Sequence, residues 1–446
     1  MRILEWSRLS GIEQRAALER PVQRARNDIE DLVREVMSAV RERGDAAVRE
    51  YTQRFDGVDL ENPRVEAAEF AAARRAVSAA QRAALERAIE NVERFHRTDG
   101  LESVSIETEP GVRCERLYRP IGAVGLYVPA GSAPLPSTVV MLAVPARIAG
   151  CPQRVLCTPP DRAGRAHPAV LLAAELCGIG EVFKVGGAQA IAALAYGTAR
   201  IPKVDKVFGP GNAWVTAAKQ AAAADPLGAA CDMPAGPSEV MVLADESARP
   251  DFLAADLLAQ AEHDANAQAI LVTPSAPLAQ AVSAAVGAQM TGLSRGGILE
   301  QSIKSSRALV VADLDTAVAV ANAYAAEHLI LEVREPRALL ARIVNAGSVF
   351  LGAWSPEPMG DYCSGTNHVL PTYGYARAYS GLGVPDYLKR ITVQELTPAG
   401  LRALGPTAVT LAQLEGLDAH AGAITCRLRA LEADAAQQRA APGSRL

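Results

Sequence analysis

The sequence is poor in aromatic residues, and it has neither a long apolar run nor a paired-cysteine motif. Phe, Trp and Tyr make up only 4% of its 446 residues, so the core must consist mainly of Ala, Val and Leu. No apolar run approaches the roughly 18–20 residues of a membrane-spanning helix. The first residues also lack the apolar stretch of a signal peptide. We therefore expect a cytoplasmic protein without a membrane segment.

The charge balance and the cysteines exclude further classes. The 45 basic and 50 acidic residues leave a net charge of −5, which recruits neither nucleic acid nor an anionic membrane. The seven cysteines are scattered, odd in number and free of any C-x-x-C spacing. This pattern indicates reduced thiols rather than a disulfide framework. We expect no nucleic-acid partner and no membrane partner.

The chain does contain a regular alternation of strand-like and helical segments. Short apolar runs predict strands at 121–129, 154–160, 181–187, 203–211, 239–245, 267–274, 307–313, 329–333 and 348–352. Helical patterns lie between them, and helices rich in Ala, Arg and Glu fill the first hundred residues and the chain after about 383. Alternation of this kind predicts an α/β fold with two series of parallel strands joined by right-handed crossovers.

A dinucleotide-binding fingerprint is missing, because no G-x-G-x-x-G follows any predicted strand. Three glycine-rich turns nevertheless follow strand-like runs and precede helices, at 127–134, 185–191 and 208–214. In open α/β sheets ligands bind at that edge, where helix N-termini attract phosphates. The alternative is that each turn merely needs glycine for a positive φ.

Possible metal ligands are spread over three segments. Gln260 and His263 are three residues apart on a predicted helix and share one face. Asp361 lies in a glycine-rich loop, and Glu415 and His420 lie in the helical tail. Nitrogen and oxygen donors of this kind suit Zn²⁺ or Mn²⁺. Alternatively, such a His lies solvated at a helix end and such an Asp forms a turn.

Glu327 and His328 stand side by side where a helical pattern changes to a strand pattern. A His near neutrality suits proton transfer, and an adjacent carboxylate suits activation of water. Neighbouring residues on a helix diverge by about 100°, so the two side chains need not touch. The alternative interpretation is a solvated helix end.

Long ordered motifs then identify a family resemblance. They are "GAVGLYVPAGSAPLPSTVVMLAVPARIAGC", "VFKVGGAQAIAALAYGT", "VFGPGNAWVTAAK", "DMPAGPSEV", "AEHLILEV" and "MGDYCSGTNHVLPTYGYAR". From about residue 20 to 430 the chain resembles the histidinol dehydrogenase family. The resemblance implies an NAD-dependent, four-electron oxidation of L-histidinol, through L-histidinal, to L-histidine, in the last steps of histidine biosynthesis. It also implies one Zn²⁺ per subunit and an intertwined homodimer whose two subunits share each active site.

The resemblance assigns roles by position in the motifs. The implied zinc ligands are Gln260, His263, Asp361 and His420. The implied catalytic residues are Glu327 and His328. The implied substrate contacts are Ser238 and Glu415, besides the four zinc ligands and His328. The implied NAD contacts are Tyr127, Gln189 and Asn212, one in each glycine-rich turn.

The resemblance also implies domain boundaries, with two Rossmann-like domains. We expect an N-terminal helical arm over 1–22 and a first α/β domain, holding the catalytic and metal residues, over 23–126 and 239–382. A second, NAD-binding α/β domain is expected over 127–238. A helical tail over 383–435 would reach the partner subunit, and 436–446 would be frayed.

Small departures from the family leave other activities to weigh. Ala326 stands where many relatives have Pro, and Ala213–Trp214 where an Ile-Tyr pair is common. Neither removes a functional side chain. One rival is an oxidoreductase of the same scaffold acting on another alcohol, such as a sulfonated diol. Others are a metal-dependent hydrolase that needs no nicotinamide, and a metal-binding protein without catalysis.

Overall fold

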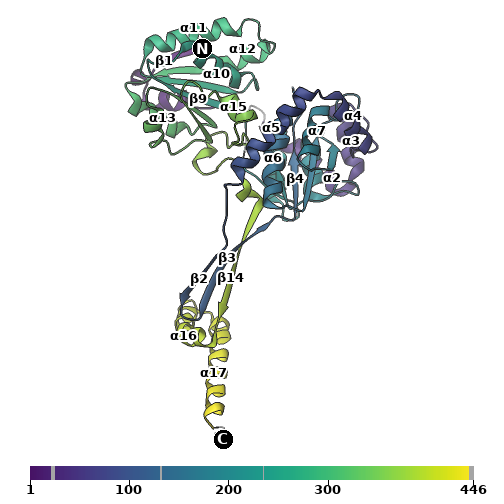
Figure 1. Ribbon diagram of the computed structural model, residues 1–446, viewed down its shortest axis with the longest axis vertical. Helices are drawn as coiled ribbons and strands as arrows, with labels where there is room; N and C mark the ends of the chain where they lie inside the picture. The colour runs from purple at the N-terminus through teal and green to yellow at the C-terminus, as the bar shows by residue number, and fades with distance from the viewer. Residues whose placement is uncertain (22–25, 131–132, 235, 441–446) are drawn as a thin grey trace. The chain divides into compact units, whose positions relative to one another are not determined.

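The computed structural model of the protein describes residues 1–21, 26–130, 133–234 and 236–440. The chain forms two compact units (Figure 1). The first comprises Met1–Asp99 and Pro120–Tyr387. The second comprises Gly100–Arg119 together with the chain from Leu388 onward. Among the described residues, no helix combines the length and the apolar character needed to cross a membrane.

The first unit contains a six-stranded sheet in which every printed pairing is parallel. In spatial order its strands are β1 (Arg2–Glu5), β11 (Arg307–Val310), β10 (Gln268–Thr273), β9 (Glu239–Ala244), β12 (His328–Glu332) and β13 (Ser348–Leu351). Every residue of β9, β10 and β12 is buried. These strands are apolar along most of their length because helices cover both faces of the sheet.

Two sets of helices supply the cores on the two faces of this sheet. One face packs against α10 (Pro250–Ala261), α11 (Ala276–Met290) and α12 (Gly296–Ser305). The other face packs against α1 (Gly11–Ala17), α13 (Leu314–Tyr324) and α14 (Pro336–Leu340). A short helix, α15 (Glu357–Tyr362), follows β13 and contacts α10.

The first unit also contains a five-stranded parallel sheet. In spatial order its strands are β6 (Glu181–Lys184), β5 (Gln153–Thr158), β4 (Ala123–Tyr127), β7 (Lys206–Phe208) and β8 (Ala230–Cys231). One core joins it to α4 (Ala67–Ala76), α5 (Ala79–His96), α6 (Pro136–Ala149) and α7 (Pro168–Leu176). The opposite core joins it to α2 (Arg26–Arg43), α3 (Asp45–Asp56), α8 (Gly187–Tyr196) and α9 (Ala213–Ala224).

The second unit is built around a three-stranded sheet of order β14-β3-β2. Its strands are β2 (Val104–Glu109), β3 (Val112–Pro120) and β14 (Leu388–Leu396), with β2 and β3 antiparallel. Two helices, α16 (Pro398–Leu414) and α17 (Asp418–Ala440), pack against each other.

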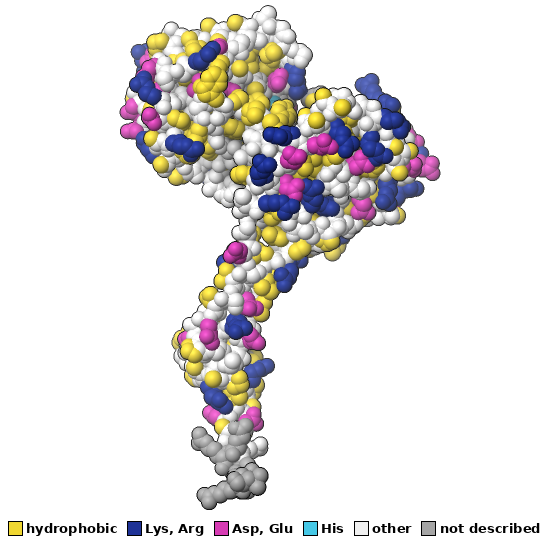
Figure 2. Space-filling model, in the orientation of Figure 1, with side chains coloured by type: hydrophobic (Ala, Val, Ile, Leu, Met, Phe, Trp, Pro, Cys, Tyr) yellow, Lys and Arg dark blue, Asp and Glu magenta, His cyan; other side chains and the backbone are white. Residues whose placement is uncertain are grey.

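Over the described residues, charged side chains of both signs are interspersed on the face of the molecule shown in Figure 2.

The expectation of an α/β fold with two parallel sheets is confirmed, and all nine predicted strands exist. Three domain assignments need correction. The helices between 26 and 96 were grouped with 239–382, but they pack around the five-stranded sheet with the expected NAD-binding segment. Their amphipathic pattern shows one buried face but not which sheet covers it.

The two ends of the chain also differ from expectation. The arm 1–22 is not wholly helical, because β1 pairs with β11 at the edge of the six-stranded sheet. The tail 383–435 contains β14, a strand whose partner β3 lies far away in the sequence. The segment 436–446 was expected to be frayed. Helix α17 continues to Ala440, and 441–446 lie outside the described residues.

Candidate metal and cofactor site

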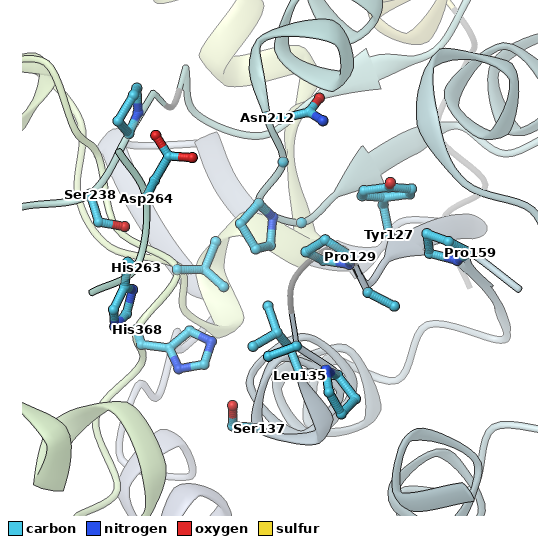
Figure 3. Close-up of a pocket in the computed structure, with 18 of the residues that line it drawn as sticks. Tyr127, Pro129, Leu135, Ser137, Pro159, Asn212, Ser238, His263, Asp264 and His368 are labelled. Atoms are coloured by element: carbon cyan, nitrogen blue, oxygen red, sulfur yellow. The ribbon is translucent and has the colours of Figure 1, made fainter. Parts of the chain in front are cut away.

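A cavity of about 1820 Å³ lies in the first unit and is lined from both sheets. Tyr127 and Asn212 line it from the five-stranded sheet and its helices. Ser238, His263 and His368 line it from the segments attached to the six-stranded sheet. Figure 3 shows these two groups facing one another across the cavity. The glycine-rich turns therefore share one pocket with a predicted metal ligand.

The backbone before β12 aims Glu327 and His328 into the protein. Helix α13 ends at Tyr324, and Ala325 adopts the left-handed conformation with φ 56°. The next two carbonyl groups accept hydrogen bonds across to the neighbouring strand: Ala326 O from Gly347 N at 2.9 Å, and Glu327 O from Ser348 N at 2.9 Å. This junction replaces the helical geometry expected for the pair. The two buried side chains approach each other, with 3.7 Å between Nδ1 of His328 and Oε2 of Glu327.

The His328 ring is enclosed by polar groups. Its Nδ1 donates to Gln260 Oε1 at 2.8 Å. Its Nε2 lies 3.5 Å from Oδ1 of Asp361 and 3.8 Å from Oε1 of Glu357. Burial alone would lower the pKa of His328, but the surrounding carboxylates, Glu327 first, raise it to about 10. The near-neutral His expected from sequence is therefore a strongly basic one in this environment.

Three potential metal ligands converge beside this ring. One ligand atom from each of His263, Glu357 and Asp361 lies within 4.8 Å of the other two. Several polar atoms here are buried without a hydrogen-bond partner in the described part of the chain: Gln260 Nε2, His328 Nε2, both Glu357 carboxylate oxygens and Asp361 Oδ1. Buried polar atoms without partners are costly unless an ion or ligand satisfies them. The nitrogen and oxygen donors fit a divalent cation such as Zn²⁺.

Sequence reasoning missed Glu357. It begins α15 four residues before Asp361, a spacing that places both carboxylates on one helical face. Burial raises the pKa of Glu357 to about 9. Burial would also raise the pKa of Asp361, but His328 holds it below its usual range. A bound divalent cation would favour the ionised forms of both carboxylates.

His368 contacts α15, the short helix that carries Asp361 in place of the expected loop. Its Nδ1 donates to the Asp361 carbonyl oxygen at 2.8 Å, and its Nε2 lies 3.2 Å from Thr138 Oγ1. Desolvation lowers the pKa of His263, which favours the neutral ring that binds metals. The lowered pKa values of His263 and Asp361 thus favour the deprotonated forms that bind a metal.

A buried ion pair between Arg20 and Glu239 lies next to Glu327. The backbone N–H of Glu239 donates to Glu327 Oε2 at 2.9 Å, and Glu327 N donates to Glu239 Oε1 at 3.3 Å. Arg20 contacts both carboxylate oxygens of Glu239, at 2.5 and 2.7 Å. Arg20 also stacks over Tyr324, whose hydroxyl donates to Glu239 Oε2 at 3.3 Å. Burial raises the pKa of Glu327 to about 8.

The opposite wall of the cavity is built from backbone turns. The N–H of Gly187 donates to the Tyr127 hydroxyl at 3.1 Å, and Gln189 Oε1 is buried without a partner among the described residues. Asn212 caps α9, its Oδ1 accepting from the two N–H groups of Trp214 and Val215. This leaves the first turns of α8 and α9 lining an open cavity, as a bound dinucleotide requires.

One glycine of this wall is required sterically. Gly209 has φ 128°, and a Cβ there would meet the Tyr127 carbonyl oxygen at 2.1 Å. Asp232 accepts from Gly209 N at 2.8 Å and also pairs with the buried Lys219, which donates to Gly209 O at 2.9 Å. Asp232 and Lys219 therefore fix this turn at the cavity wall. A turn fixed in this way favours a role in ligand binding over that of a turn that merely needs glycine for a positive φ.

The predicted site residues divide between the two units. The first unit brings Gln260, His263, Asp361, Glu327 and His328 together, and Ser238, Tyr127, Gln189 and Asn212 line the cavity. Glu415 and His420 belong to the second unit and are exposed there. Gly131 and Ser132 of the first turn and Ala235 near Ser238 lie outside the described residues.

Comparison with known proteins places this geometry in context. Residues 18–428 match the family model described as histidinol dehydrogenase. A histidinol dehydrogenase of Xanthomonas euvesicatoria is 54% identical over 428 residues, which cover 96% of this chain and 99% of the relative. That of Yersinia pestis is 52% identical and covers 96% of each chain. The crystal structure of histidinol dehydrogenase from Elizabethkingia anophelis superposes with a TM-score of 0.92 at 45% identity, covering 97% of this chain and 99% of that one.

Proposed function

Because the chain belongs to the histidinol dehydrogenase family, we propose that it oxidises L-histidinol, through L-histidinal, to L-histidine at the cavity of the first unit. Each turnover would consume one water and two NAD⁺ and would release two NADH. The observation that supports this most is the convergence of His263 and Asp361 with the Glu327–His328 pair beside a cavity that the three glycine-rich turns line.

The metal site would be formed by Gln260, His263 and Asp361, with His420 from a partner subunit. Zinc bound there would hold the imidazole and amino nitrogens of the substrate and so fix the carbon to be oxidised. Glu357 reaches the same cluster and would compensate the charge of the ion. Buried oxygens of Glu357 and Asp361 that have no hydrogen-bond partner among the described residues support this assignment.

The cofactor would lie along the opposite wall, against Tyr127, Gln189 and Asn212. NAD⁺ bound there would accept the hydride in each of the two oxidation steps. The first turn of α8, where the described residues supply no capping side chain, would face its phosphates. The glycine required at 209 lets its turn approach the Tyr127 backbone closely and so keeps that turn in place at the cavity wall.

The two proton transfers need different groups. A divalent cation bound beside its ring would lower the pKa of His328 from the high value that the carboxylates give it. The neutral ring would then take the proton of the substrate hydroxyl in the first step and that of the hydrated aldehyde in the second. Glu327 would take a proton from the water that adds to the aldehyde. The two side chains are close enough to interact electrostatically, with 3.7 Å between His328 Nδ1 and Glu327 Oε2, and each would serve its own proton transfer.

The test separates the two half-reactions. Glu327→Gln is expected to slow oxidation of supplied histidinal by about 10²–10⁴-fold, while His328→Ala slows both steps. Exposed Glu335, at the start of α14, provides the matched control Glu335→Gln. Unchanged formation of histidine by Glu327→Gln would contradict the water-activating role. Counting two NADH per histidine would exclude the hydrolase alternative, which predicts turnover without nicotinamide.

We further propose that the working enzyme is a homodimer in which Glu415 and His420 complete the partner's site. This would explain why two polar residues matching the family's site motifs are exposed on the second unit. The substrate carboxyl, once formed, would lie among Ser238 and these residues. Zinc content measured on mixed dimers of His420→Ala and Asp361→Ala chains tests the sharing, because only mixed dimers would regain one complete site.

A further inference from the structure

Asp56 places a carboxylate in the cavity that neither proton transfer nor metal binding uses. It is the last residue of α3 and lines the cavity beside Tyr127 and Gln189. Gln189 Nε2 donates to Asp56 Oδ2 at 3.4 Å. Asp56 also acts electrostatically on the buried Tyr127 hydroxyl, whose pKa burial raises first and Asp56 raises further. The three side chains form one polar cluster on the cofactor wall.

Keeping an acid at this position costs free energy. The carboxylate lies at the negative end of the α3 dipole, where an acidic side chain is unfavourable. It is half-buried, and burial is what raises its pKa to about 6. Within the described residues no basic side chain pairs with it. By contrast Asp59, three residues later, is exposed and paired with Arg49.

The cluster lies away from the reacting groups. Figure 3 shows Tyr127 and Pro159 on one side of the cavity and His263 and His368 on the other. A dinucleotide whose nicotinamide reaches the Glu327–His328 pair must therefore place its other nucleoside near Tyr127. The neutral hydroxyl groups of a ribose are hydrogen-bond donors for which a carboxylate with a free lone pair is the fitting acceptor.

We propose that Asp56 binds the adenosine ribose of the cofactor and selects NAD⁺ against NADP⁺. This inference rests on the proposed function. A ribose 2′-hydroxyl would donate to the Asp56 carboxylate, whereas a 2′-phosphate would bring a second negative group against it. Gln189, fixed by its contact with Asp56, has a buried Oε1 without a partner in the described chain and would accept from the second hydroxyl.

A purely structural role for Asp56 predicts something different. If the carboxylate only oriented Gln189, its loss would weaken binding of phosphorylated and unphosphorylated ribose equally. If the carboxylate hydrogen-bonds to the ribose, its loss weakens binding of the unphosphorylated ribose and removes the repulsion of the 2′-phosphorylated one. The ratio of the two affinities therefore separates the roles.

The experiment measures binding without chemistry. Calorimetric titration of the full-length, zinc-loaded protein with ADP-ribose and with 2′-phospho-ADP-ribose gives both dissociation constants. For Asp56→Asn we expect affinity for ADP-ribose to fall about tenfold, since one charged hydrogen bond is lost, and affinity for the 2′-phosphorylated probe to rise. Asp56→Ala is the second variant, and Glu50→Gln, on the exposed face of the same helix, is the matched control.

Each outcome has a defined meaning. A change in the ratio of affinities in both Asp56 variants but not in Glu50→Gln supports the proposal. An unchanged ratio overturns it, even if both affinities fall. If the wild-type protein oxidises histidinol with NAD⁺ but the affinity ratio is the same in the Asp56 variants, only the role of Asp56 is refuted. A wild-type protein that binds neither probe refutes the cofactor assignment itself. Melting temperatures of the variants show whether each one is folded.

Discussion

Replacing Arg20 by Met should lower the free energy of unfolding of the first unit far more than the same change at Arg49. Both guanidinium groups contact both oxygens of one carboxylate, Arg20 on Glu239 and Arg49 on Asp59. The Arg20 and Glu239 side chains are only 12% and 1% exposed, against 48% and 47% for the second pair. Removing one partner of a buried pair costs about 3–5 kcal/mol, whereas an exposed pair contributes about 0–1 kcal/mol.

The double variant identifies the source of that cost. In Arg20→Met an ionised Glu239 stays buried, with only the Tyr324 hydroxyl and the Glu327 N–H as partners among the described residues. Adding Glu239→Gln removes the uncompensated charge and should restore most of the free energy of unfolding that Arg20→Met loses. Urea unfolding, followed by circular dichroism and tryptophan fluorescence, gives the four free energies. Equal losses of under about 1 kcal/mol for Arg20→Met and Arg49→Met would refute the reasoning.

Three further predictions address pH, backbone strain and the metal. Burial raises the pKa of Asp56 to about 6 from 3.8, so the folded protein binds this proton more tightly than the unfolded chain and loses stability as pH rises through that window. The melting temperature of Asp56→Asn should thus match wild type near pH 4 and exceed it above about pH 6.5; a constant difference would contradict this. Ala325→Gly should stabilise the protein by up to about 1 kcal/mol, because Ala325 has a positive φ; calorimetry showing a loss would exclude strain there. Truncation before residue 410 should abolish zinc retention, and full zinc content by atomic absorption would contradict the shared site.

The fold was predictable where strands are buried on both faces. The run "EVMVLA" of β9 and the run "QAILVT" of β10 are wholly buried, and such runs have few alternatives in a chain with helices between them. Strand β14 was missed because its residues, "LKRITVQEL", are mostly exposed and include three charged side chains. Its partner β3 lies about 270 residues earlier, and no local pattern reveals such a pairing.

The site was predictable only in part. Gln260 and His263 were expected to share a helical face, but α10 ends at Ala261 and His263 lies just beyond it. Glu357 and Asp361 do share a face of α15. Glu357 was overlooked although the same rule would have found it. Arg20 is different, because its role depends on Glu239, which lies 219 residues away and comes close only when the sheet is formed. Long-range charge compensation leaves no periodic signal in a sequence.

The register of the six-stranded sheet explains why Arg20 is needed. His328 lies opposite Val240, so the residues before them, Glu327 and Glu239, enter neighbouring strands side by side. Two buried carboxylates at this spacing repel each other, and one of them must stay neutral or find a cation. Arg20 compensates the charge of the Glu239 carboxylate. The backbone N–H of Glu239 can therefore donate to Glu327 without placing a second uncompensated negative charge beside that carboxylate. The segment that follows α1 would therefore support the proposed role of Glu327, because it removes one source of repulsion to the ionised carboxylate, whose pKa burial raises to about 8.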